Sequence, residues 1–463
     1  DNVVKEPLIA EGTVLKGSPV KKTVEDKQLG TTEWTLANGA KVVVKPTTFK
    51  ADEVRLGVVG KGGLSLLSDE EYYHDPRREG VQKTDEEYYM GEMMPAVNSM
   101  SGVGKFSATE LKKQLSGKTA SVQPSVENYT SAMGGVCSPK DIETMLQLLY
   151  LNFTQPRFNK DDVDNLTKML LAQLANAKSN PDFLMQEKVA DVTYGHNPRR
   201  QMISTEIVNK FDFEQLPGIY AKLYPGANGF VFTFVGNIDP ETLKPLVEKY
   251  IGSIPAARKP INYVDDKAYP VKGEVTEEFT APMQQPKVSV NYHFSGEMPY
   301  TLKNKMALTF LTQALNSRYL VSIREEKGGT YGVRVQGSTK YIPRETYSMT
   351  ISFDTNEEMA DELVPIVFDE IEKIATEGPE AKDINDSREY LVKQFKNTLE
   401  NNGTWFGLID DYNRHKQNLL ADYEKTLNSI TYDEIRDLAK KLLDSGNVIQ
   451  VTMRPEAQPE ADE

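Results

Sequence analysis

The feature that most constrains this chain is an internal repeat. The segment "GKTASV" (117–122) returns 211 residues later as "GGTYGV" (328–333). From Gly117, 113 positions lead to an apolar strand-like segment at Phe230, and from Gly328, 119 positions lead to another at Asn447. Self-similarity at this spacing indicates a tandem duplication of one domain of about two hundred residues.

The two repeats contain the same order of predicted elements. The first has a hairpin at Asn38-Gly39, a typical two-residue turn, followed by a third strand in "DEVRLGVVGKGG". Ser107 and Glu110 form a capping box that begins a helix, and Ser138-Pro139 begins a strongly amphipathic one. Several more helices and a closing strand then complete the first repeat.

The second repeat follows the same plan. "KVSVNYHF" predicts a strand, residues 303–324 a helix, and two strands follow around 331–338 and 346–353. Long helices fill 380–443 before the closing strand "GNVIQVTM". Strands and helices therefore cluster separately. This predicts an α+β fold of two tandem homologous domains, each a mostly antiparallel sheet with helices packed on one face.

At 463 residues the chain is too long for one ordinary hydrophobic core, which agrees with two domains. We expect an extended lead-in over 1–27, a first α+β domain over 28–255, a linker over 256–275, a second such domain over 276–455, and an acidic tail over 456–463.

Composition narrows the classes of function. A hydrophobic fraction of 39% with 26% charged residues is typical of a globular protein. The net charge of −14 argues against nucleic acid as a partner, because phosphate binding needs a basic face. The sequence contains no run of about eighteen apolar residues, so it predicts no membrane span. The single Cys137 excludes an internal disulfide.

The first residue, Asp1, is not Met, so we expect a processed chain or a fragment of a longer one. The compartment is not encoded in any recognisable segment. An exported bacterial location, in the periplasm or cell envelope, is our working expectation.

Metal chemistry has few candidate ligands. The four histidines are His74, His196, His293 and His415, and none has a partner at HExxH or HxxEH spacing. His293 lies inside an apolar strand, where a structural role is the simpler interpretation. We therefore expect no zinc site built from this chain alone.

Other motifs are weak. "SGVGKFS" resembles a phosphate-binding loop, but Phe106 stands where Ser or Thr would bind magnesium. Cys137 precedes a helix cap and has no evident base beside it in the sequence. "DEEYY" occurs at 69–73 and again at 85–89. These copies fit either a helix face with a solvated insertion or a ligand-facing loop, and charge runs favour the first.

The stretch "REEKGGTYGV" (324–333) raises a sharper question, because two glycines separate an Arg from a Tyr. Taken alone, Arg324 fits a surface ion pair and Tyr331 an aromatic residue packed on a sheet.

Five segments favour a functional role for Arg324 and Tyr331 over these structural ones. They are "WTLANGAKVVV", "SGVGKFSATELKKQLSGK", "SPKDIETMLQLLYLNFTQPRF", "FTFVGNIDPETLKPLVEKYIGSIP" and "IREEKGGTYGV". With them, residues 30–455 resemble the C-terminal half of a pitrilysin/insulinase-type zinc metallopeptidase. The resemblance implies two halves that close around an unstructured peptide. The N-terminal half would hold zinc through HxxEH and a downstream Glu, and the C-terminal half would contribute an Arg and a Tyr seven positions apart.

The resemblance assigns roles to named residues. Arg324 and Tyr331 have that spacing and become the expected catalytic pair, donating hydrogen bonds to the substrate carbonyl as negative charge develops on it. Gly328, Gly329 and Thr330 become expected substrate-binding residues, with the glycines allowing a tight turn.

The family's metal motif has no counterpart here, since the matching region 90–104 contains no His. The resemblance therefore implies no cofactor in this chain and zinc in an HxxEH-bearing N-terminal partner half, whether from the same gene product or a separate subunit. Two functions remain open. The chain is either the non-metal half of a zinc metalloendopeptidase, inactive without its partner half, or a catalytically silent structural or substrate-holding subunit.

Overall fold

The computed structural model describes residues 4–67, 85–325, 330 and 332–457. The chain forms two compact units. Unit 1 consists of Asp1–Leu171, Thr205–Asp266 and Thr398–Leu420, and unit 2 consists of Ala172–Ser204, Lys267–Asn397 and Ala421–Glu463. The main division, between Asp266 and Lys267, falls inside the predicted linker.

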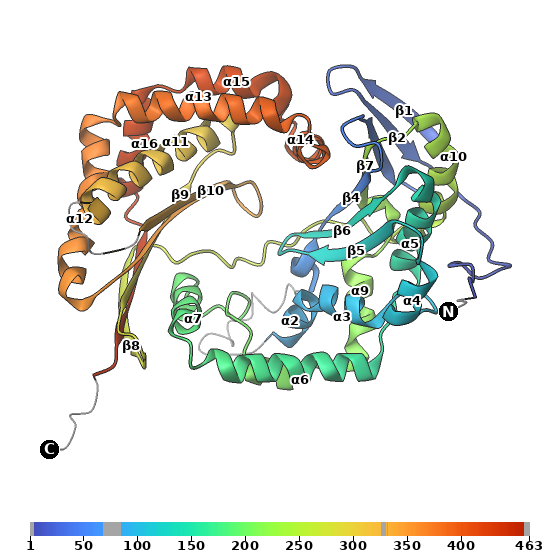
Figure 1. Ribbon diagram of the computed structural model, residues 1–463, viewed down its shortest axis with the longest axis horizontal. Coiled ribbons are helices and arrows are strands. Elements are labelled where there is room, and N and C mark those ends of the chain that lie inside the picture. The colour runs from blue at the N-terminus through green and yellow to red at the C-terminus, as the bar shows by residue number, and fades with distance from the viewer. Residues whose placement is uncertain (1–3, 68–84, 326–329, 331, 458–463) are drawn as a thin grey trace. The chain divides into compact units, whose positions relative to one another are not determined.

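Each unit contains one sheet (Figure 1). Within the described residues, the sheet of unit 1 has the order β1-β2-β3-β7-β4-β6-β5, and that of unit 2 has the order β10-β11-β9-β12-β8. The strands of unit 1 are β1 (Val20–Asp26), β2 (Thr31–Leu36), β3 (Lys41–Pro46), β4 (Val54–Lys61), β5 (Ala120–Val126), β6 (Thr130–Cys137) and β7 (Phe230–Gly236). Those of unit 2 are β8 (Glu274–Ala281), β9 (Val288–Glu297), β10 (Val333–Lys340), β11 (Thr346–Thr355) and β12 (Val448–Pro455).

The two sheets share a five-strand pattern. The order β3-β7-β4-β6-β5 in unit 1 corresponds to β8-β12-β9-β11-β10 in unit 2. In both, the first pair is parallel and the other three pairs are antiparallel. The strands that begin within "GKTASV" and "GGTYGV", β5 and β10, occupy equivalent edge positions. The repeat detected in the sequence is thus a repeat of sheet topology.

Helices surround both sheets. Those lying wholly in unit 1 are α2 (Glu86–Glu92), α3 (Met94–Ser101), α4 (Ala108–Gln114), α5 (Ile142–Thr154), α8 (Thr205–Asn209), α9 (Leu216–Leu223), α10 (Pro240–Tyr250) and α14 (Asn402–His415). Those in unit 2 include α7 (Pro181–Thr193), α11 (Leu302–Tyr319), α12 (Glu357–Glu377), α13 (Ala381–Thr398) and α16 (Tyr432–Asp444). The chain passes from one unit to the other within α6 (Lys160–Ala177) and α15 (Leu419–Ser429).

The core of unit 2 lies on one face of its sheet. Tyr292 and Phe294 of β9 and Ile351 of β11 are buried there against α11, α12 and α16. Alternate residues of a strand point to opposite faces, so Ser289, Asn291 and His293 face the other way. The predicted fold class is confirmed, with most helices on the core face.

One helix from each repeat packs on the other repeat's sheet. Helix α7 comes from the first repeat but lies against β12, β8 and β9 of unit 2, on the face away from the core. Helix α14 comes from the second repeat but lies against β7 and β4 of unit 1. The sequence boundaries 28–255 and 276–455 therefore describe repeats, whereas the compact units exchange one helix each.

Two strands depart from the sequence-based expectation. β1 lies within the predicted extended lead-in, and β8 was not predicted. Both are edge strands, and β1 is exposed over Lys21–Glu25, so it carries no alternation of apolar residues. Among the described helices, none has the length and apolar character needed to cross a lipid bilayer.

Candidate functional site

A groove of about 950 Å³ lies in unit 2, on the face of its sheet away from the core. Residues of α7 line one side, and residues of β9, β11 and the segment that begins β10 line the rest. The floor is polar because the outward-facing positions of β9 and β11 are Ser289, Asn291, His293, Ser352 and Asp354. The groove thus combines a polar sheet surface with a partly apolar helix.

Apolar packing fixes α7 beside this floor. Met185 and Val192 of α7 are buried against Ile449, Val451 and Met453 of β12. Fully burying a side chain of this kind contributes about 1.5–3 kcal/mol, so the contact is a substantial part of what holds the helix. Asn180 caps the helix by accepting a hydrogen bond from the Asp182 amide at 3.0 Å.

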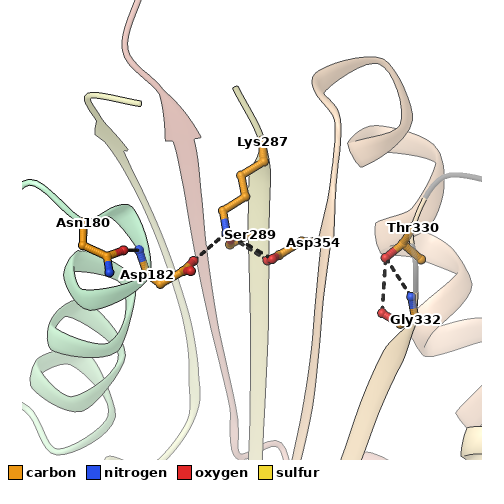
Figure 2. A network of polar contacts seen from close by, with 7 residues as sticks. All are labelled: Asn180, Asp182, Lys287, Ser289, Thr330, Gly332 and Asp354. Atoms are coloured by element: carbon orange, nitrogen blue, oxygen red, sulfur yellow. Dashed lines mark hydrogen bonds and ion pairs between the residues drawn. The ribbon is translucent and has the colours of Figure 1, made fainter. Parts of the chain in front are cut away.

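An ion-pair cluster fastens the start of α7 to the sheet (Figure 2). Lys287 Nζ lies 2.5 Å from Asp182 Oδ1 and 3.2 Å from Asp354 Oδ2. The Ser289 hydroxyl donates to Asp354 Oδ1 at 2.7 Å. Burial on its own lowers the pKa of Lys287, but the hydrogen bonds and charges of the two carboxylates outweigh it, and the net pKa is raised.

The segment predicted to bind substrate reaches the same groove. Thr330 and Gly332 both line it. The Thr330 hydroxyl accepts from the Gly332 amide at 3.3 Å and lies 3.2 Å from the Gly332 carbonyl oxygen, to which it donates (Figure 2). Gly328, Gly329 and Tyr331 lie outside the described residues. Tyr331 is nevertheless flanked on both sides by groove residues.

Arg324 is the penultimate residue of a π-helical turn, Leu320–Glu325, which continues α11. Its side chain is exposed, and it is not among the residues that line the groove. Turns of this type are rare and occur frequently at functional sites. The described residues thus bring Thr330 to the groove and leave Arg324 on the turn that leads into it.

Sequence reasoning missed two basic residues of the groove. Arg334 was not singled out, although it follows Gly332 by two positions and so faces the same side of β10. His293 was interpreted as a structural strand residue, and its ring does lie largely buried in the sheet. Burial, together with the nearby charge of Lys340, lowers the pKa of His293 to about 4, so the ring is neutral at pH 7.

The local surroundings of the other candidate residues argue against a functional role for them. Burial, followed by the charge of Asp141, raises the pKa of the Cys137 thiol to about 12, which leaves it protonated and unsuited to nucleophilic attack. In the second "DEEYY" copy, Asp85 caps α2 while Tyr88 and Tyr89 are buried, so this copy is a helix face. The first copy lies outside the described residues.

The described residues do not fit a zinc ion. Within residues 4–67, 85–325, 330 and 332–457, no group of three or more His, Cys, Asp or Glu side chains could hold a metal. His196 pairs with Asp191 at 2.7 Å on the surface, and His293 is enclosed in a strand. Tetrahedral zinc needs three or four such ligands together, and these side chains do not provide them.

Comparison with known proteins places the chain. Residues 210–391 match the family model described as the peptidase M16 inactive domain. That match covers 182 of the 463 residues, so this part of the chain is similar to the peptidase M16 family. The Arabidopsis thaliana protein named "Zinc protease PQQL-like" is 24% identical to this chain over 424 residues. The aligned region covers 88% of this chain and 40% of the relative. This chain therefore spans well under half the length of that relative.

Solved structures agree on the fold. The crystal structure of the periplasmic protease PqqL from Escherichia coli superposes with a TM-score of 0.82 at 17% identity, covering 98% of this chain and 48% of that one. A peptidase M16 inactive domain from Pseudomonas fluorescens superposes with a TM-score of 0.73 at 18% identity, covering 93% and 100%. The predicted resemblance to the non-metal half of this peptidase family is confirmed.

Proposed function

We propose that this chain is the substrate-holding, non-metal half of an M16 zinc metalloendopeptidase, and that it completes an active site with an HxxEH-bearing half. The observation that carries the proposal is the groove itself. Thr330 and Gly332, which both belong to the segment singled out by the family resemblance, line it. An unstructured peptide is the expected substrate, because the sheet floor is long, polar and open.

In this proposal Arg324 and Tyr331 act on the substrate carbonyl. The guanidinium and the phenol hydroxyl donate hydrogen bonds to the oxygen, whose negative charge grows as the carbonyl carbon becomes tetrahedral. Donors held in place beforehand stabilise this charge without reorganising. Arg324 lies within a π-helical turn, a rare conformation that occurs frequently at functional sites.

Partner and location follow from the same proposal. The described residues contain no group suited to zinc, so the metal would belong to an N-terminal half, in the same gene product or a separate subunit. The E. coli relative is a periplasmic protease, which supports an exported location for this chain.

The test is peptide cleavage by the chain mixed with an HxxEH-bearing half. Arg324→Ala and Tyr331→Phe should each lower kcat about a hundredfold or more, with association of the halves unchanged. Arg436→Ala and Tyr390→Phe, exposed residues on α16 and α13, serve as matched controls and should retain parental turnover.

A second function is kept because the matched family model describes an inactive domain. In that case the chain holds substrate or structure without contributing to chemistry. Parental turnover by both the Arg324 and Tyr331 variants, with the halves shown to associate, would favour this silent subunit.

A further inference from the structure

Strand β10 presents basic side chains on the groove face. Alternate residues share a face, so Arg334, Gln336, Ser338 and Lys340 form one row, in register with the outward-facing residues of β11. Arg334 is exposed, Lys340 is reached by solvent but has protein groups packed around its ammonium, and the two stand at the ends of this row. A rise of about 3.3 Å per residue places them about 20 Å apart along the strand.

These two cations lack acidic partners within the described chain. The groove carboxylates, Asp182 and Asp354, both pair with Lys287 instead. None of the ion pairs among the described residues includes Arg334 or Lys340. The donors of both side chains are therefore available to a ligand.

Further positive charge surrounds the Lys340 end. Burial lowers the pKa of Lys340, and the charge of Arg200 lowers it further, so two cations lie close together there. The charge of Lys340 in turn helps to lower the pKa of His293 on β9. This end of β10 therefore carries positive charge within a chain of net charge −14.

The occupant is argued from the rest of the groove. Met185 and Val189 of α7 give it an apolar side, which suits a polypeptide and not a nucleic acid backbone. We propose that Arg334 and Lys340 form a two-point basic strip that binds two acidic side chains of an extended peptide substrate. The matching acids would be six positions apart, because residues i and i+6 of an extended chain face the same side and span the same distance.

This inference rests on the proposed substrate-holding function and sharpens it to acidic peptides. Its test is binding, measured without any partner half or cleavage, so it can fail while the peptidase role stands. The role itself is decided by turnover of the Arg324 and Tyr331 variants.

The experiment uses the full 463-residue chain and fluorescein-labelled twelve-residue peptides of Ser, Ala and Gln, followed by fluorescence anisotropy. One peptide carries Glu at positions i and i+6, a second carries Gln at both, and a third carries Glu at i and i+5, which face opposite sides. We expect the i,i+6 peptide to bind about tenfold more tightly than the Gln peptide, with the i,i+5 peptide between them.

Variants assign the effect to residues. Arg334→Gln and Lys340→Gln should each remove most of the Glu preference and leave binding of the Gln peptide unchanged. Arg436→Gln makes the same change of net charge on α16 and should retain the preference. Arg334→Glu should improve binding of a peptide with Lys at one position, a gain that a misfolded variant would not give.

Three outcomes would overturn the proposal. Equal affinity for the Glu and Gln peptides, including no binding of either, removes the acidic preference. An equal loss in Arg436→Gln attributes the preference to net charge alone. A twelve-nucleotide oligothymidylate that binds as tightly as the i,i+6 peptide shows an unselective anion surface instead.

Discussion

The two sheets have the same five-strand core, and each receives a helix from the other repeat, yet the helices are fastened differently. In unit 1, α14 packs aromatic side chains against the sheet. Phe406 lies against Gly57, and the Lys45 ammonium sits 4.0 Å from the centre of the Trp405 ring. In unit 2, α7 has no aromatic side chain buried at the sheet and relies on aliphatic packing and on the Lys287 ion pairs.

The difference teaches how one architecture can serve two purposes. Aromatic rings bury more area than Met or Val, so α14 closes tightly over the centre of its sheet. The smaller side chains of α7 hold the helix at the β12 side and leave the groove over β9 and β11. Under the proposed function, unit 1 would be the structural copy and unit 2 the copy that binds substrate.

The largest expected effect is on the aromatic contact of unit 1. Trp405 is 8% exposed, and its indole N–H donates to the Leu399 carbonyl at 2.7 Å. Trp405→Ala should lower the free energy of unfolding by about 3–5 kcal/mol, measured by urea denaturation. Met185→Ala on α7 should cost less, about 2 kcal/mol. Equal losses of unfolding free energy in the two variants would show that α14 and α7 are held equally strongly.

An acid-sensitive group distinguishes unit 2. The pKa of His293 is lowered to about 4 in the folded chain, chiefly by burial and then by Lys340, so the unfolded chain takes up the proton first as pH falls. Stability is complete above about pH 6.5 and is lost as pH falls towards 4, by about 2–3 kcal/mol.

His293→Gln should flatten this part of the stability profile, because Gln does not titrate. Melting temperatures between pH 4 and 7 decide it. A His293 variant that keeps the parental slope would assign the acid sensitivity to other groups.

A glycine pair offers the most closely matched comparison. Gly57 and Gly134 face each other in the β4–β6 register. A Cβ at Gly57 would lie 1.9 Å from the Phe406 ring, whereas one at Gly134 meets nothing within 4 Å. Gly57→Ala should cost about 1–3 kcal/mol through overpacking. Gly134→Ala should be neutral or slightly stabilising, and a similar cost for both would show that Phe406 moves aside freely.

The smallest expected effect concerns the ion-pair cluster around Lys287 in unit 2. Lys287→Met removes both ion pairs and should cost about 1 kcal/mol, since the groups remain partly exposed to solvent. Because the folded pKa of Lys287 is raised, its contribution is complete below the unfolded pKa of about 10.4 and is lost as pH rises through the folded value. Melting temperatures of parent and variant should therefore converge above that pH. A constant difference would assign the effect to packing.

Elements with strong local sequence patterns were predictable. The hairpin around Asn38-Gly39, the capping box at Ser107 and the repeated strand segments all appear where the sequence places them. The edge strands β1 and β8 escaped because solvent covers much of them and no run of apolar residues is needed. The helix exchange escaped because periodicity shows that a helix has an apolar face but not which sheet covers it.

The site was predictable only in part. Thr330 was selected through the family resemblance and does line the groove. Arg334 escaped because a lone Arg on a strand is most often a solvated surface residue. Its interest arises only from the groove beside it and from Lys340 six positions on, and that juxtaposition requires the folded register.

The exchanged helices also bear on how such a chain could arise. A single repeat would expose the strip of sheet that its missing helix covers, and would carry a helix with no sheet of its own to pack on. Two copies of that repeat would satisfy both needs by trading helices, as domain-swapped homodimers do. Once the two copies are joined in one gene, each can change its sequence without having to stay complementary to an identical copy. One sheet could then gain rings that lock its helix in place, while the other kept a basic strand beside an open groove.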